Sequence, residues 1–163
     1  MELIDVITSK ENLNRAYKKV VENKGAGGID GMKVEELGAY IKDNKDEIIH
    51  SIRNRTYMPK PVRRVYIPKD NGKQRPLGIP TVLDRVIQQA IAQPIIEIYE
   101  EVFSDFSYGF RPGRSCHDAV KQALEYLNEG YEWVIDIDIE QFFDKVNPVS
   151  YTHLRAHETD SYL

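Results

Sequence analysis

The 163-residue sequence has one cysteine, Cys116, and no apolar run long enough to span a membrane. A single cysteine excludes an intrachain disulfide framework and fits a reducing compartment, and no zinc-type spacing of histidine and cysteine surrounds it. The first residues, MELIDVITSKENL, lack the basic and apolar regions of a signal peptide. We therefore expect a soluble, cytoplasmic protein without a membrane partner.

Positive charge is scarce overall but concentrated in one stretch. The 26 acidic residues outnumber the 22 Lys and Arg residues. Between Ile52 and Arg75, however, eight basic residues stand against one acidic residue, Asp70. Such a run forms either a solvated face or a phosphate-binding surface, and the sequence leaves both readings open. Tyr57 and Tyr66 lie among these charges and could stack on bases or sugars.

Helical spacing of apolar residues predicts several helices in the first third of the chain. Thr8 and Glu11 have the capping-box spacing that opens a helix, which should end near Gly25. The GAGGIDG stretch that follows predicts a flexible loop, and it lacks the Lys-Ser or Lys-Thr ending of a P-loop. Two further helices are expected over residues 34–42 and 45–53.

Residues 63–80 predict a β-hairpin. The stretch RRVYIP alternates like a strand, KDNGK supplies turn residues, and RPLGIP can return as the partner strand. We expect the basic side chains of this hairpin to project from one end.

Two more helical regions are expected after the hairpin. Thr81 and Asp84 resemble an N-cap. Pro94 should kink or break the helix that they open, and a second helical piece should cover residues 95–103. After a loop rich in aromatic residues and arginine, another helix is expected from the cap at Ser115.

The stretch WVIDIDIE, residues 133–140, alternates apolar and acidic side chains. A period of two places Asp136, Asp138 and Glu140 on one face of a strand. Aspartate is disfavoured in strands and like charges on one face repel, so the arrangement costs stability unless water or a cation neutralises it. Magnesium binds carboxylate oxygens together with substrate phosphates. An exposed face and a metal site therefore remain alternatives.

Four blocks of sequence, in this order, resemble the opening blocks of the reverse transcriptases encoded by bacterial group II introns: NKGAGGIDG, PVRRVYIPKDNGKQRPLGIPTVLDRVIQQAI, FSDFSYGFRPGRSCHDAV and WVIDIDIEQFFDKVN. The resemblance covers residues 12–147. It implies an α+β fold, with right-hand polymerase fingers made of helices plus an antiparallel hairpin, and the first strand of an incomplete palm. It also implies an RNA-directed DNA polymerase that binds its intron RNA and assists splicing as a maturase. The implied partners are the intron RNA template, a DNA primer and deoxynucleoside triphosphates.

The resemblance assigns roles to individual residues. Asp138 matches the first catalytic aspartate of the palm, and it would bind a metal ion together with the backbone carbonyl of Ile139. Phe142 matches the bulky residue that excludes a ribose 2′-hydroxyl. Lys69 and Arg75 match the fingers residues that hold the incoming triphosphate. Two Mg²⁺ ions are implied for the complete enzyme.

Four arginines are expected to contact nucleic acid: Arg63, Arg64, Arg111 and Arg114. For the last two, a role in bracing the fingers is an equally open alternative. The glycine-rich stretch matches the family's N-terminal extension near template and primer.

Residues 148–163 depart from the family pattern. The run VSYTHLRAHET resembles a translated reading frame of the transposon-end adapter used in sequencing-library preparation. We therefore expect a partial reverse transcriptase domain at residues 1–147 and a non-native tail at 148–163. The sequence contains no Asp-Asp pair, so it lacks the family's Tyr-x-Asp-Asp motif, and this chain by itself should not polymerise. The alternatives are a retron or diversity-generating-element reverse transcriptase, or a non-catalytic RNA-binding fragment.

Overall fold

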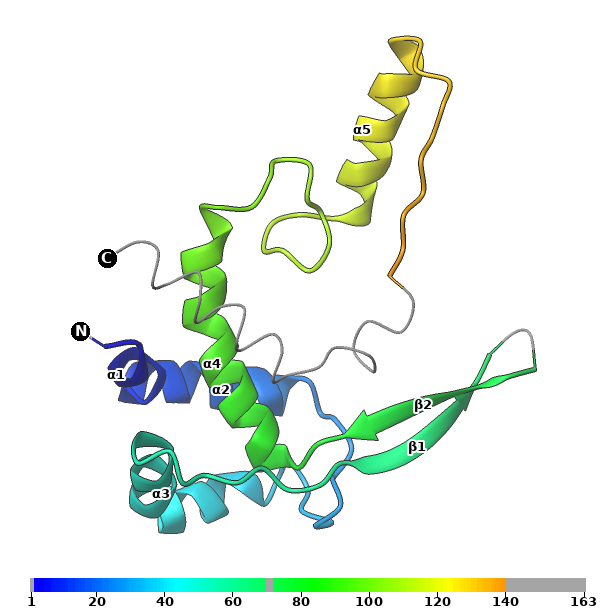
Figure 1. The fold of residues 1–163 in the computed structure, drawn as a ribbon. Helices are drawn as coiled ribbons and strands as arrows, with labels where there is room; N and C mark the ends of the chain where they lie inside the picture. Colours follow the sequence, from blue (N-terminus) through cyan, green and yellow to red (C-terminus); the bar gives the residue numbers. More distant parts are fainter. Residues whose placement is uncertain (1, 70–71, 140–163) are drawn as a thin grey trace. The chain divides into compact units, whose positions relative to one another are not determined.

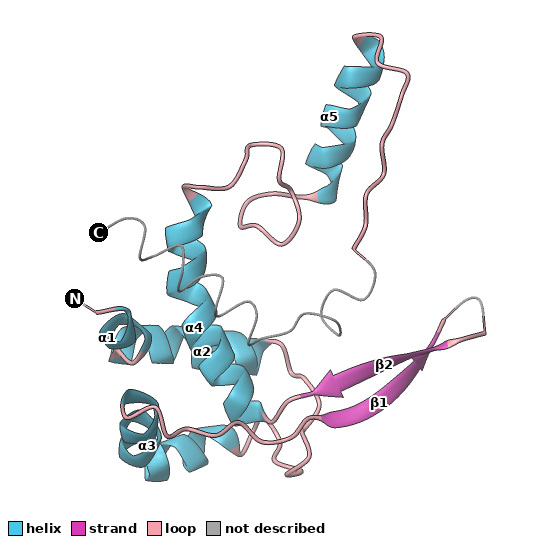
Figure 2. Cartoon of the chain, viewed as in Figure 1, coloured by secondary structure: helices cyan, strands magenta, loops and turns pink. Residues whose placement is uncertain are grey.

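The computed structural model describes residues 2–69 and 72–139. The chain divides into two compact units, Met1–Cys116 and His117–Leu163, which are considered separately. Figure 1 and Figure 2 show helices and one antiparallel hairpin, which confirms a mixed fold of helices and strands. The elements are α1 (Leu3–Ile7), α2 (Lys10–Glu22), α3 (Leu37–Arg53), β1 (Arg63–Pro68), β2 (Gln74–Ile79), α4 (Val82–Glu100) and α5 (Cys116–Asn128).

Across the described ranges, no helix combines the length and the apolar character needed to cross a bilayer.

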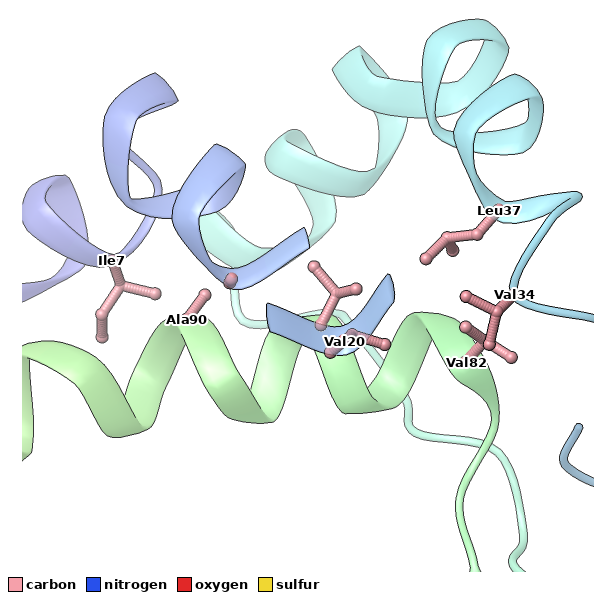
Figure 3. Close-up of a cluster of buried hydrophobic side chains, with 8 residues drawn as sticks. Ile7, Val20, Val34, Leu37, Val82 and Ala90 are labelled. Atoms are coloured by element: carbon pink, nitrogen blue, oxygen red, sulfur yellow. The ribbon is translucent and has the colours of Figure 1, made fainter. Parts of the chain in front are cut away.

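The core of the first unit lies between α2 and α4, with α1 packed against both. Ala16 on α2 and Ala90 on α4 are fully buried, and their small side chains let the two helices approach closely. Figure 3 shows Ile7 beside Ala90 at one end of this core. Helical spacing predicts that the apolar residues of α2 and α4 face inward. Ala16, Val20, Val86 and Ala90 are buried, which confirms these positions, whereas Ile91, predicted inward on the same spacing, is 38% exposed. The buried cluster consists of Ile7, Ala16, Val20, Val34, Leu37, Val82, Val86 and Ala90.

The start of α2 differs by one residue from the predicted cap. The side chain of Ser9, not Thr8, accepts a hydrogen bond from the Asn12 backbone amide at 3.2 Å. The Thr8 hydroxyl instead donates to the Ile4 carbonyl at 2.7 Å, so it completes the end of α1. The capping-box prediction at Thr8 was therefore wrong, because a short helix that the sequence pattern does not reveal uses this hydroxyl.

One continuous helix, α3, replaces the two short helices predicted for residues 34–53. The predicted break fell at Asp43 and Asn44, which are weak helix formers. Asn44 donates its side-chain amide to the Tyr40 carbonyl, 2.8 Å away, one turn earlier. Beyond Gly38 in the first turn, the helix contains neither proline nor glycine, so it continues to Arg53.

Helix α4 also continues where a break was predicted. Pro94 has no backbone N–H, so it cannot donate to the carbonyl of Ala90 one turn earlier. The side-chain amide of Asn12 donates to that carbonyl at 2.7 Å and to the Ile7 carbonyl at 3.0 Å. The helix does not break at Pro94, because a hydrogen bond from a different helix replaces the one that proline removes.

The hairpin is confirmed, with Arg63 paired to Ile79 and Pro68 paired to Gln74. The Lys69 amide donates to the Lys73 carbonyl at 2.7 Å. Hydrogen-bonded and non-hydrogen-bonded residue pairs alternate along an antiparallel ladder. Counting from this hydrogen-bonded pair, the backbone groups of Pro68 and Pro76 point toward the outer edges of the hairpin. A missing N–H there removes no bond between the strands, and it also hinders pairing with another chain.

In the second unit, α5 is followed by a run without regular secondary structure. The predicted first strand of the palm is not seen in residues 131–139, where no strand is assigned and the side chains are exposed. A strand needs a neighbour for its backbone groups, and the described part of this unit offers none. The apolar side chains predicted to share one face are 64% to 94% exposed: Trp133, Ile135, Ile137 and Ile139.

Candidate functional site

The tip of the hairpin brings Lys69 and Arg75 together. Arg75 lies directly opposite Ile67 in the ladder, and Lys69 lies two residues beyond Ile67, so the two basic residues share one face. Both side chains are exposed. Within residues 2–69 and 72–139, no ion pair engages either of them. Their charges are therefore available to an anion.

The other two basic residues predicted on β1 lie away from this pair. Arg63 shares the face of Lys69 but stands six residues earlier, roughly 20 Å along an extended strand. Arg64 lies on the opposite face, together with Tyr66, which is 58% exposed. The hairpin thus separates the pair Lys69 and Arg75 at its tip from basic and aromatic groups elsewhere.

A buried carboxylate ties the base of the hairpin to α4. Asp84 is 2% exposed, and its Oδ1 accepts a hydrogen bond from the Tyr57 hydroxyl at 2.6 Å. Its Oδ2 accepts from the Thr81 hydroxyl at 2.6 Å and from the Lys60 backbone amide at 3.2 Å. The predicted cap is confirmed, because Thr81 also accepts from the Asp84 amide at 3.1 Å. Sequence reasoning missed the long-range donors, although an acidic residue on the buried face of α4 was a signal.

Burial raises the pKa of the Tyr57 hydroxyl, and the hydrogen bond to the negative Asp84 carboxylate raises it further. Both effects disfavour the phenolate, because a second negative charge would form in a partly buried place. Tyr57 therefore remains a hydrogen-bond donor to Asp84 over the whole neutral and mildly alkaline range.

The glycine-rich stretch forms the predicted loop, and this loop packs against the same base. A Cβ on Gly28 would lie 2.6 Å from the Cα of Thr81, which shows how closely the two backbones approach. Lys60 forms an ion pair with Asp30 of the loop at 3.3 Å. The Arg85 guanidinium donates to the Ala26 carbonyl at 2.6 Å. Only glycine fits the close approach to α4.

Arg111 braces the loop that follows α4. Its side chain is 6% exposed and pairs with Glu100, with Nη2 2.7 Å from Oε1. Its Nη1 donates to the carbonyls of Ser104 and Ser107 at 2.6 and 2.9 Å, and the guanidinium lies 5.3 Å from the centre of the Phe103 ring. The hydrogen bond from Arg111 lowers the pKa of Glu100. Of the two roles left open for Arg111, the structure shows the bracing one.

Arg114 is held less tightly in the same loop. Its Nη1 donates to the Asp105 carbonyl at 2.6 Å, and its guanidinium lies 5.7 Å from the centre of the Tyr108 ring. The side chain keeps 28% of its surface exposed. A contact of either loop arginine with nucleic acid stays a prediction.

The residues predicted to bind metal stand in the second unit. Asp138 and Ile139 are exposed in the run after α5, as is Asp136. Among the described residues, no three His, Cys, Asp or Glu side chains gather where they could hold a metal ion. These residues alone therefore do not complete a metal site. Phe142 and the tail at 148–163 lie outside the described residues.

A family model for reverse transcriptases (RNA-dependent DNA polymerases) matches residues 67–160, a range that includes Lys69, Arg75 and Asp138. The chain belongs to this family.

Relatives of this reverse transcriptase chain include intron-encoded proteins. It is 42% identical over 136 residues to the group II intron-encoded protein LtrA of Lactococcus lactis subsp. cremoris, covering 83% of this chain and 22% of LtrA. It is 39% identical over 151 residues to protein YkfC of Escherichia coli strain K12, covering 89% and 40%. It is 27% identical over 114 residues to nuclear intron maturase 1, mitochondrial, of Arabidopsis thaliana, covering 69% and 14%. The predicted likeness to group II intron reverse transcriptases is confirmed, and the chain spans less than half the length of these relatives.

Proposed function

We propose that this chain forms the fingers and the beginning of the palm of a group II intron-encoded reverse transcriptase, and that its hairpin holds the incoming deoxynucleoside triphosphate. The observation that carries the proposal is the exposed pair Lys69 and Arg75 on one face of the hairpin tip. The whole protein would copy RNA into DNA from a primer. As a maturase it would also bind its intron RNA and assist splicing.

The spacing of the two basic residues suits a triphosphate. Lys69 and Arg75 are diagonal neighbours on adjacent strands, which places their Cβ atoms about 7 to 8 Å apart. The lysine offers a compact positive charge, and the arginine offers a planar fork that can bind two phosphate oxygens at once. Together they can neutralise charge on neighbouring phosphates, as phosphoryl transfer requires.

Magnesium is the proposed metal, with two ions in the complete enzyme. Bound Mg²⁺ would polarise phosphoryl oxygens and stabilise the charge that develops during transfer. Asp138 would supply one carboxylate and Ile139 a backbone carbonyl. These two residues are only part of a ligand set, so this chain by itself is not expected to polymerise.

RNA binding without catalysis is a second candidate. It is favoured by the basic excess between Ile52 and Arg75 and by Arg64 and Tyr66 on the other face of the hairpin. An RNA strand that follows this surface would lose affinity steeply as salt rises, because each neutralised phosphate releases counterions.

Binding of a fluorescent deoxyadenosine triphosphate to the purified chain, in magnesium buffer, tests the triphosphate site. Lys69→Ala and Arg75→Ala should each weaken binding about tenfold, which corresponds to about 1.4 kcal/mol for a lost charge-assisted contact. Arg63→Ala and Arg64→Ala are the matched controls. They remove the same charge at the far end and on the opposite face, and they should leave the affinity for the triphosphate within about twofold.

The same variants, assayed with a single-stranded RNA, separate the two candidates. If Arg64→Ala weakens RNA binding but not triphosphate binding, the faces have the proposed division of roles. If all four variants weaken triphosphate binding equally, the hairpin is only a diffuse basic surface and the proposed site is wrong.

A further inference from the structure

The strongest unassigned feature is the place where the chain enters and leaves the hairpin. Tyr57 and Lys60 precede β1, and Thr81 follows β2. All three donate hydrogen bonds to one carboxylate, that of Asp84, at 2.6, 3.2 and 2.6 Å. A single buried side chain therefore joins the two ends of the hairpin to the first turn of α4.

The hairpin itself has little else to fix its direction. Almost every residue of β1 and β2 is exposed, and only Val65 and Ile79 are partly covered. Figure 1 shows the ribbon extending away from the helices at its base. Because no layer of side chains covers either face of the strands, the angle at which the hairpin leaves the helices depends on the contacts at its base.

We propose that Asp84 is a positioning residue that sets the direction of the hairpin and thereby the place of Lys69 and Arg75 relative to the helices. This inference rests on the proposed function, since it concerns how the triphosphate-binding pair is presented. Asp84 touches neither member of the pair and acts through the hairpin backbone. The glycine-rich loop supports the same junction through the Asp30–Lys60 ion pair.

A carboxylate suits this position better than its amide. Ionised aspartate only accepts hydrogen bonds, and three donors converge on it here. In Asp84→Asn an NH₂ group replaces one carboxylate oxygen. Facing the Lys60 amide, it would set two N–H donors against each other; facing Tyr57, it would force that hydroxyl to accept instead of donate. In either orientation the three donors no longer share a charged acceptor, so the junction is weakened. Tyr57→Phe removes one donor and leaves the other two, so it is the milder variant.

Distance measurements between spin labels test the proposal directly. The labels are placed at Gln74→Cys on β2 and Asp46→Cys on α3, both exposed sites in the first unit, in a Cys116→Ser chain. Double electron–electron resonance should give one narrow distance distribution in the parent. In Asp84→Asn it should broaden about twofold or shift, and in Tyr57→Phe it should broaden less, because fewer base contacts remain.

Val20→Ala is the control, because it removes methyl groups from the α2–α4 core without touching the junction. It should lower the thermal midpoint as Asp84→Asn does and leave the distance distribution narrow. If Asp84→Asn keeps the parent distribution, or if Val20→Ala broadens it equally, Asp84 is not a positioning residue.

Nucleotide binding keeps this test separate from that of the proposed function. Lys69 and Arg75 move together with the hairpin, so Asp84→Asn should leave triphosphate affinity within about twofold. A failure of Lys69→Ala to weaken triphosphate binding would overturn the proposed function, whatever the spin labels show. A narrow distribution in Asp84→Asn would overturn the positioning role alone.

Discussion

At the scale of single residues, Asn12 replaces a backbone donor that proline removes. It is 5% exposed, and its side-chain oxygen also accepts from Gln93 at 2.7 Å. Its side-chain amide donates to the carbonyls of Ala90 and Ile7, neither of which receives a hydrogen bond from a backbone N–H of its own helix. One polar side chain therefore lets α4 pass through Pro94 without a break.

The exchange between Asn12 and Pro94 is measurable as a double-mutant cycle. Asn12→Ala should lower the free energy of unfolding by about 2 to 3 kcal/mol, because it leaves buried carbonyls without donors. In a Pro94→Ala chain the new backbone N–H can satisfy Ala90, so the same substitution should cost about 1 kcal/mol less. Urea unfolding of the four chains gives the coupling. An equal cost in both backgrounds would show that the Asn12 amide does not stand in for the missing N–H.

Tyr57 gives the junction a dependence on alkaline pH. The pKa of its hydroxyl is raised in the folded chain, while in the unfolded chain it titrates near about 10. Above that pH the unfolded state releases the proton first, so the stability due to the neutral hydroxyl is complete below about pH 10 and is lost as pH rises further. As the pH rises from about 8 to about 11, the free energy of unfolding should therefore fall less steeply in Tyr57→Phe than in the parent chain. Parallel curves for the two chains would contradict this account.

At the scale of elements, the glycine-rich loop and α4 meet with no room for a side chain. A Cβ on Gly28 would lie 2.6 Å from Thr81 Cα and 2.9 Å from the Pro80 carbonyl oxygen. Both neighbours are backbone, so they cannot rotate away as a side chain would. The loop therefore contributes to the rigidity of the hairpin base.

Gly28→Ala should lower the free energy of unfolding by about 2 kcal/mol, the range expected for overpacking. Gly109→Ala is the matched control, because nothing lies within 4 Å of its Cβ position. That substitution should change stability by no more than about 0.5 kcal/mol. Thermal or urea unfolding distinguishes the two, and equal stability of both variants would mean that the loop does not pack on α4 as described.

At the scale of the whole chain, local signals in the sequence were enough for the hairpin, the Thr81 cap and most inward positions of α2 and α4. The hairpin follows from its turn residues, and the cap follows from a threonine hydroxyl three residues before the backbone amide that it accepts from. The inward positions follow from the helical spacing of apolar residues. The family resemblance singled out Lys69 and Arg75 together, and the strand register in the structure shows that they lie on the same face of the hairpin.

Two of the contacts that sequence reasoning missed join residues distant in the chain. Asn12 and Ala90 are 78 residues apart, and Tyr57 and Asp84 are 27 residues apart. A pattern over a few neighbouring residues does not predict such a contact. The strand predicted after α5 is not observed for a related reason. Apolar and acidic residues alternate there as in a strand, but a strand also needs a neighbouring strand to pair with, which the described residues do not provide.

The most direct test of the central claim compares deoxyadenosine triphosphate with deoxyadenosine monophosphate as competitors for nucleotide binding to the unsubstituted chain. If Lys69 and Arg75 hold the outer phosphates, the triphosphate should compete about tenfold or more better, and this preference should fall to about one in the double variant Lys69→Ala, Arg75→Ala. Equal competition by the two nucleotides, or a preference that survives the double substitution, would contradict the assignment of the hairpin tip as the triphosphate site.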